Sequence, residues 1–300
     1  MVILERPPSP SLLGDSAGAI RSTLPPVPVH DHEAQSVLGS RQDQPGATMI
    51  RRALIAYWLS EAPLVLRAKQ ILTAVLPAPV QVALKRPYNL WVLRQGQIEA
   101  DAEGVRRLVH GGVALDVGAN IGSYTRLLAG LADEVIAIEP VPETFDHLRF
   151  NMHSLGVRNV RLLNAAASDR DGQVMIEIPR YRRGPEAIAD ARVVQSPTNL
   201  RHFMVAAMRI DSLALNRLDF IKIDVEGHEI PVVRGALETI ERFRPAMIIE
   251  SVLAEGDWLY PILEPLGYRG FVWRDGAFCL TSRWERSPNV FFLMPQHTAR

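Results

Sequence analysis

Residues 220–229, F-I-K-I-D-V-E-G-H-E, place several ionisable side chains directly after an apolar run. Asp224, Glu226 and His228 lie where that run ends. A desolvated carboxylate, or an imidazole that is neutral near physiological pH, can take a proton from a substrate at such a position. We therefore predict a catalytic role for these three residues, with at least one of them acting as a general base or orienting a substrate.

Two other interpretations of this segment stay open. Positions 224, 226 and 228 point the same way in an extended chain, and carboxylates and imidazoles bind divalent cations. Alternatively, Glu226 and Glu229 only add negative charge to the start of the next helix, where the helix dipole favours anions. We favour the acid–base interpretation and predict no metal ligand. Lys222, inside the apolar run, is expected to pair with a carboxylate.

A second group of residues has the layout of a nucleotide-type ligand site. Residues 113–125, V-A-L-D-V-G-A-N-I-G-S-Y-T, read as a strand, a turn containing glycines and the start of a helix. A second apolar run ends at Glu139, about 20 residues further on. Gly118 and Gly122 let the backbone approach a ligand, the helix start offers free N–H groups, and Glu139 can accept both ribose hydroxyls.

The details of this turn favour S-adenosylmethionine (SAM) over NAD. The dinucleotide fingerprint is G-x-G-x-x-G, because the pyrophosphate packs on bare backbone at the middle glycine. Here Asn120 occupies the place of that glycine, and Asp116 lies two residues before Gly118. An acid at Asp116 suits the ammonium group of SAM and would repel phosphates.

These two groups of residues require a scaffold that brings strand ends together. Strands alternating with helices predict an α/β fold with a doubly wound, mostly parallel, Rossmann-like sheet. Ligands bind at the carboxyl ends of the strands of such sheets. Strands are expected at 89–94, 113–117, 135–138, 160–164, 173–179, 220–225, 246–251, 268–273 and 289–293, and helices at 99–109, 121–131, 142–155, 230–243 and 258–266.

Residues 180–202 depart from the alternation, since they are polar, rich in arginine and turn-prone. A long loop inside a compact domain is usually a lid, a substrate loop or disordered. We interpret this one as an insertion that faces the substrate.

The first part of the chain differs from the rest in composition. Residues 1–48 are rich in Pro, Ser, Gly and Gln and are expected to form a disordered tail. Residues 49–87 are expected to be a helical segment that precedes a catalytic domain at 88–300. Within it, 49–76 has a wide apolar surface that either packs on the domain or contacts a membrane surface or another subunit.

Composition limits the other classes of function. The chain has 300 residues, with 33 basic and 33 acidic side chains, so no basic excess favours nucleic acid as a partner. Cys279 is the single cysteine, which excludes an internal disulfide. No secretory signal and no transmembrane span is visible, and the expected location is the cytoplasm.

With both groups identified, the sequence resembles the FkbM family of SAM-dependent methyltransferases. The shared stretches are L-D-V-G-A-N-I-G-S-Y-T (115–125), V-I-A-I-E-P-V-P-E-T-F-D-H-L-R-F-N (135–151), N-A-A-A-S-D-R-D-G (164–172), I-D-S-L (210–213), F-I-K-I-D-V-E-G-H-E (220–229) and R-P-A-M-I-I-E (244–250). D-V-G-A-N-x-G together with K-I-D-V-E-G-x-E is a specific combination. The resemblance covers residues 88–295.

The resemblance implies the class I methyltransferase fold, with a seven-stranded sheet whose last strand runs antiparallel. It also implies positions for the cofactor. Glu139 would lie at the ribose and Asp224 beside the methyl group. The other residues expected around SAM are Asp116, Gly118, Asn120 and Gly122 at the methionine part, Asn164 and Ala165 at the adenine, and Ala119, Thr125 and Pro140 within the same motifs.

Members of the family mostly methylate hydroxyl oxygens, so the resemblance implies an O-methyltransferase acting on a sugar, a glycan or a secondary metabolite. Methylation of nitrogen is the alternative within the same chemistry. A scaffold that binds SAM without catalysis is the alternative from another class, and turnover with an acceptor would separate it from an enzyme.

Overall fold

The computed structural model describes residues 76, 78–96, 101–180, 187–250, 256–281 and 288–298. All of them belong to one unit, Gly46–Arg300, and Met1–Pro45 are a separate unit. The tail expected at 1–48 and the helices expected at 49–76 lie outside the described residues, apart from residue 76 at their end.

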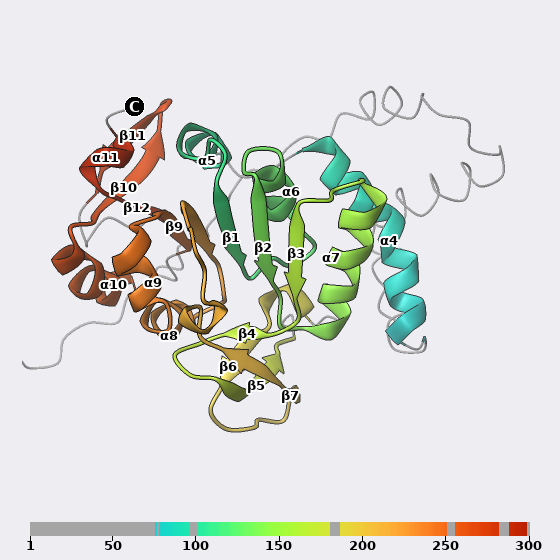
Figure 1. The fold of residues 1–300 in the computed structure, drawn as a ribbon. Helices are drawn as coiled ribbons and strands as arrows, with labels where there is room; N and C mark the ends of the chain where they lie inside the picture. Colours follow the sequence, from blue (N-terminus) through green and yellow to red (C-terminus); the bar gives the residue numbers. More distant parts are fainter. Residues whose placement is uncertain are drawn as a thin grey trace, which may run out of the picture. The chain divides into compact units, whose positions relative to one another are not determined.

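The described residues form a main sheet in the order β11-β10-β12-β9-β8-β1-β2-β3 (Figure 1). Neighbours from β3 to β9 pair in parallel, and β12 is antiparallel to β9. The strands are β1 (Val113–Val117), β2 (Glu134–Ile138), β3 (Val160–Leu163), β8 (Phe220–Ile223), β9 (Ala246–Glu250), β10 (Arg269–Arg274), β11 (Ala277–Leu280) and β12 (Asn289–Leu293).

Helices cover both faces of this sheet. One face packs on α5 (Ala102–Leu108) and α6 (Ser123–Ala129), and the other on α8 (Glu229–Arg234), α9 (Leu237–Phe243) and α10 (Gly256–Leu263). The central strands are buried on both faces, which explains why they read as continuous apolar runs. The doubly wound, Rossmann-like class I fold is confirmed, including the antiparallel last strand. The hairpin strand β11 adds an eighth strand at the edge.

A second, smaller sheet has the order β4-β7-β5-β6. Figure 1 shows it beyond the carboxyl ends of β1, β2 and β3. Its strands are β4 (Ala166–Ala167), β5 (Gly172–Ile178), β6 (Arg192–Val194) and β7 (Arg201–Met208). The expectation that 180–202 is one long loop was therefore wrong, because β6 and the start of β7 lie within it. Residues 181–186 are outside the described part.

The strand expected at 89–94 was also wrong, because these residues lie in α4 (Ala78–Gln95). Leu90 and Leu93 are buried at helical spacing, and Leu93 packs on the same cluster as Leu148 of α7 (Pro142–Ser154). A short apolar run does not by itself distinguish a strand from a helix. The boundary expected between the helical segment 49–87 and the domain 88–300 therefore falls inside α4, and both share this helix.

The helix expected at 230–243 is divided into α8 and α9 around Gly235. A Cβ atom at this position would lie 1.9 Å from the carbonyl oxygen of Ser168, so only glycine allows this close approach. The carbonyl of Gly235 also accepts the N–H of Asp211 instead of continuing one helix.

Four short elements complete the description: the 3₁₀ turns η1 (Ile188–Asp190), η2 (Asp211–Leu213) and η3 (Glu264–Leu266), and the terminal helix α11 (Pro295–Thr298). Within the described ranges, none of the helices has the length and apolar character needed to cross a bilayer.

Candidate active site

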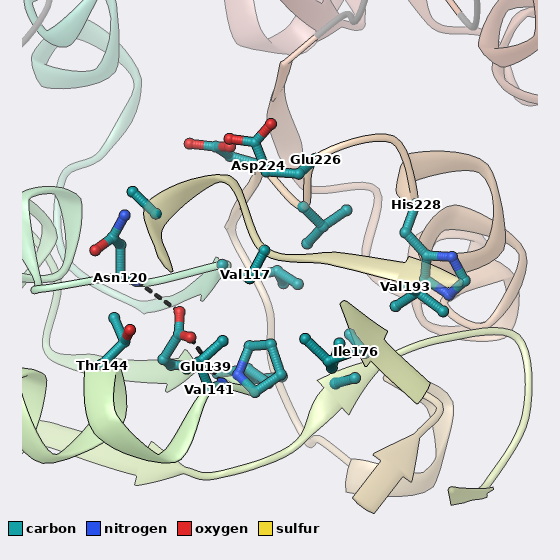
Figure 2. A pocket seen from close by; sticks show the side chains of 18 of the residues that line it. Val117, Asn120, Glu139, Val141, Thr144, Ile176, Val193, Asp224, Glu226 and His228 are labelled. Carbon is teal, nitrogen blue, oxygen red and sulfur yellow. Dashed lines mark hydrogen bonds between the residues drawn. The ribbon is translucent and has the colours of Figure 1, made fainter. Parts of the chain in front are cut away.

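A pocket opens at the carboxyl ends of β1, β2 and β8, where the order of the sheet reverses. It has a volume of about 740 Å³ including its open mouth. Figure 2 shows its side chains. The lining comprises Val117, Gly118 and Asn120 after β1; Ile138, Glu139, Pro140, Val141 and Thr144 after β2; Asp224, Val225, Glu226 and His228 after β8; and residues of the second sheet and η1.

Gly118 allows β1 and β8 to end side by side. Its φ is +79°, and an added Cβ would lie 1.7 Å from the carbonyl oxygen of Asp224. The turn is also held by β2, because the N–H groups of Gly118 and Ala119 both donate to the carbonyl of Ile138, at 2.9 and 3.0 Å. Between the polar residues after β1 and β2 and those after β8, the pocket is therefore lined by the backbone of Gly118, which has no side chain.

Asp116 lies beneath this turn and does not line the pocket. Its side chain is fully buried. One carboxylate oxygen accepts a hydrogen bond from the hydroxyl of Thr125 at 2.5 Å, and the other lies 3.8 Å from Nζ of Lys222. Asp116 and Thr125 are thus placed to support the turn and to hold the lysine.

Ala119 and Gly122 also lie behind the pocket wall. Ala119 packs in one cluster with Leu148 and Met152 of α7. An added Cβ at Gly122, whose φ is +100°, would lie 2.6 Å from Met152 and 2.7 Å from Leu148. The two residues therefore determine how closely the turn packs on α7.

Glu139 is bonded to the backbone of the pocket on both sides. One carboxylate oxygen accepts the N–H of Asn120 and the other the N–H of Val141, each at 2.9 Å. The side chain is only 5% exposed. Burial raises the pKa of Glu139 to about 7, against the opposing effect of the two backbone N–H groups. Figure 2 shows this carboxylate beside Asn120.

Asn164 and Ala165, expected near an adenine, are not among the residues that line the pocket, and Asn164 is exposed. The amide of Asn164 donates to the carbonyls of Glu139, at 2.8 Å, and Pro140, at 3.2 Å, and so holds the end of β2. Ala165 is buried, and the next two residues, Ala166 and Ala167, line the pocket.

The second sheet supplies an apolar wall that the sequence analysis did not identify. Ile176 of β5, Ile188 of η1 and Val193 of β6 line the pocket on this side, and Ile176 and Val193 are labelled in Figure 2. Small or aliphatic residues at these positions are also typical of ordinary cores. Only the alternation of β5 could have indicated which side chains face inward.

The residues after β8 form a charged group. Nζ of Lys222 donates to a carboxylate oxygen of Asp224 at 2.8 Å, and Lys222 is buried. The expectation that this lysine pairs with a carboxylate is confirmed. Burial alone would lower the pKa of Lys222, but the charges of Asp116 and Asp224 outweigh it and raise the pKa.

Glu250, at the end of β9, joins this group although the sequence analysis did not select it. Carboxylate oxygens of Asp224, Glu226 and Glu250 all lie within 4.8 Å of one another. Figure 2 shows the carboxylates of Asp224 and Glu226 side by side. His228 is not part of that set, so the arrangement of 224, 226 and 228 proposed for a cation is not present.

His228 instead contacts the second sheet. Its Nε2 lies 2.9 Å from the hydroxyl oxygen of Ser168, the residue that follows β4. Burial lowers the pKa of His228, with Asp169 opposing the shift and Arg170 adding to it. The ring is therefore neutral at physiological pH and connects the start of α8 to the end of β4.

Comparisons with known proteins identify the family of this chain. Residues 116–269, just over half of the chain, match the FkbM methyltransferase domain. The hexuronic acid methyltransferase AglP of Haloferax volcanii is 28% identical over 130 residues, which are 43% of this chain and 52% of AglP. The chain thus spans about half the length of this curated relative.

Solved structures were compared in the same way. A methyltransferase FkbM from Methylobacillus flagellatus aligns with a TM-score of 0.41 and 14% identity, covering 70% of this chain and 59% of that one. A SAM-dependent methyltransferase from Aquifex aeolicus aligns with a TM-score of 0.34 and 16% identity, covering 68% and 97%.

The sheet order and the position of the pocket are those of a class I methyltransferase fold. Within that class, the chain belongs to the FkbM methyltransferase domain family.

Proposed function

We propose that this protein is a SAM-dependent methyltransferase that methylates a hydroxyl oxygen of a sugar, a glycan or a secondary metabolite. The observation that carries the proposal is the pocket that extends from Glu139 to the carboxylates after β8, across the backbone of Gly118. A nucleoside bound at the Glu139 end and an acceptor bound at the end formed by the residues after β8 would meet in the middle of this pocket.

The residues at the first end fit SAM. Each oxygen of the Glu139 carboxylate accepts one backbone hydrogen bond, and a carboxylate oxygen can accept a second. Two ribose hydroxyls can therefore donate to Glu139 without displacing its present partners. The apolar wall of Ile176 and Val193 fits the flat face of an adenine.

The same contacts are unfavourable for NAD. A pyrophosphate in a Rossmann site accepts the free N–H groups of the glycine-rich turn. Here the N–H of Asn120 already donates to Glu139, and those of Gly118 and Ala119 donate to Ile138. The turn has no donor from these three residues left for a phosphate.

When bound, SAM would supply an activated methyl group on sulfur. The protein then has to orient the acceptor in line with the methyl carbon and to remove the acceptor's proton. Orientation of this kind lowers barriers by roughly 7–11 kcal/mol, and a positioned base adds a factor of about 10²–10⁴. Asp224, Glu226 and His228 line the part of the pocket where a base is needed.

A sugar hydroxyl is the acceptor we favour. The proposal is supported by the similarity to a hexuronic acid methyltransferase. It is also supported by the carboxylates that follow β8 in the pocket, which can accept a proton from a hydroxyl group.

Calorimetry with SAM, S-adenosylhomocysteine and NAD tests the cofactor assignment. We expect SAM and S-adenosylhomocysteine to bind and NAD not to bind, and tighter binding of NAD would overturn the assignment. Incubation with methyl-labelled SAM and methyl glucuronide or other glycosides, followed by mass spectrometry, tests the reaction. A protein that binds SAM but methylates no hydroxyl or amine in a broad panel would be a binding scaffold.

A further inference from the structure

We propose that Glu226 is the group that takes the proton from the methyl acceptor, and that Glu250 is a positioning residue that acts through Asp224. This inference rests on the proposed methyl transfer and assigns separate roles to the three neighbouring carboxylates. Glu250 was not among the residues selected from the sequence, and it does not line the pocket.

Asp224 is unsuited to be the base because its carboxylate is already bonded. It accepts a hydrogen bond from Nζ of the buried Lys222 at 2.8 Å, and a carboxylate oxygen of Glu250 lies within 4.8 Å of it. Burial would raise the pKa of Asp224, but the charge of Lys222 and the interactions with Glu250 and Lys222 together lower it. A carboxylate stabilised in this way is a weak proton acceptor.

Because the carboxyl groups of Asp224 and Glu250 lie this close together, ionisation of both is unfavourable and one of them keeps a proton. That proton resides on Glu250. Burial, the hydrogen bond to Asp224 and the negative charges of Asp224 and Glu226 raise the pKa of Glu250 to about 9. Glu250 is therefore neutral at physiological pH and can donate a hydrogen bond to Asp224.

Glu226 is the carboxylate of this group that remains available. It lines the pocket, and no other described side chain forms a hydrogen bond or ion pair with it. Its φ is +53°, a left-handed conformation that is uncommon for residues other than glycine. Such strain is maintained at functional sites when the surrounding structure requires it.

The electrostatic surroundings adjust Glu226 to its role. Burial raises its pKa to about 6, and the negative charges of Asp224, Asp190 and Glu229 add to the effect while Lys222 opposes it. Glu250 also lies beside Glu226 but carries its proton. A carboxylate with this pKa is ionised at pH 7 and still basic enough to accept a proton during the transfer.

The proposed methyl transfer conserves atoms and electrons. The acceptor oxygen forms a bond to the methyl carbon, the carbon–sulfur bond breaks, and its electron pair returns to sulfur, which becomes a neutral thioether. The acceptor's proton moves to the carboxylate of Glu226, which becomes neutral and later releases the proton to solvent. His228 is the other candidate base, but its Nε2 is occupied by Ser168.

A carbon-13 NMR titration of the full-length protein, labelled at the Glu side-chain carboxyl carbons, tests the assignment without an acceptor. We expect one signal to titrate near pH 6 and to vanish in Glu226→Gln. A second should remain protonated at pH 7 and vanish in Glu250→Gln. Glu238→Gln, at a side chain that is 81% exposed, is the matched control and should change neither signal. Ionised Glu250 at pH 7, or Glu226 titrating below pH 5, would overturn the proposal.

Kinetics separate the base from the positioning residue. With methyl-labelled SAM and methyl glucuronide, Glu226→Gln should lower kcat by about 10²-fold or more, while SAM affinity measured by calorimetry changes less than threefold. Glu250→Gln supplies the same neutral donor and should keep kcat within about threefold, whereas Glu250→Ala should lose activity. A Glu250→Gln variant as inactive as Glu250→Ala would refute the donor role.

The same samples reveal two other outcomes. Addition of millimolar Mg²⁺ should leave the signals of Glu226 and Glu250 unchanged, and a joint shift of both would show that a cation occupies the group and would overturn the inference. If calorimetry detects no SAM binding by the parent protein, the proposed function fails, and the NMR titration still decides which carboxyl group carries the proton.

Discussion

Replacing Gly118 by alanine tests whether the close approach of β1 and β8 builds the pocket. The new Cβ would lie 1.7 Å from the carbonyl oxygen of Asp224, whereas real Cβ contacts are essentially never shorter than 3.0 Å. The end of β8 must therefore move by at least 1.3 Å, the difference between these distances. This displacement weakens the hydrogen bond from the N–H of Asp224 to the carbonyl of Val117, now 3.0 Å.

The cost has three parts. A left-handed alanine costs about 1–2 kcal/mol, overpacking costs about 1–3 kcal/mol, and the weakened backbone hydrogen bond costs about 0.5–1.5 kcal/mol. Gly118→Ala should therefore lower the free energy of unfolding by about 3–6 kcal/mol. Because Asp224 moves with the strand end, SAM affinity should fall as well.

Gly156→Ala is the matched control. Its φ is +70°, close to the +79° of Gly118, but no heavy atom lies within 4 Å of the added Cβ. This variant should lose only the conformational part, about 1–2 kcal/mol, and should bind SAM as the parent does. Urea unfolding and calorimetry measure both quantities.

Equal destabilisation of the two variants, within about 1 kcal/mol, would refute the argument, because the contact with Asp224 would then have no energetic consequence. Unchanged SAM affinity in a folded Gly118→Ala protein would show that the strand ends do not shape the cofactor site.

Three further expectations follow from the site. SAM should bind more tightly at pH 8 than at pH 6, because only the ionised form of Glu139, whose pKa is about 7, accepts both ribose hydroxyls. Glu139→Gln should weaken binding by about 1–3 kcal/mol and remove this pH dependence in calorimetry. Lys222→Met leaves the buried carboxylate of Asp116 and the half-buried carboxylate of Asp224 without their cation, and should destabilise the protein in urea by about 3–5 kcal/mol. His228→Ala should lower kcat less than Glu226→Gln with the same acceptor, and an equal loss would return His228 to the role of base.

The core of the site could be predicted from the sequence because its signals are local. Gly118, Glu139 and Asp224 each follow an apolar run within one or two residues, and the carboxyl ends of neighbouring parallel strands meet at one edge of a sheet. The positions of β1, β2 and β8 therefore followed from the alternation of runs and turns. Lys222 was expected to pair with a carboxylate because it lies inside an apolar run, where an isolated ammonium group is unfavourable.

Tertiary structure decided the features that depend on residues far apart in the chain. The run at 89–94 became part of a helix because α4 packs on α7, and the second sheet formed because β5 pairs with β7 across the polar segment between them. The contact of His228 with Ser168 joins the start of α8 to the end of β4, and the carboxylates of Asp224 and Glu250 come together from the ends of β8 and β9. A local sequence pattern indicates which face of a segment is apolar. Which other segment buries that face depends on the sum of many contacts between residues far apart in the chain, and these contacts can override local propensity.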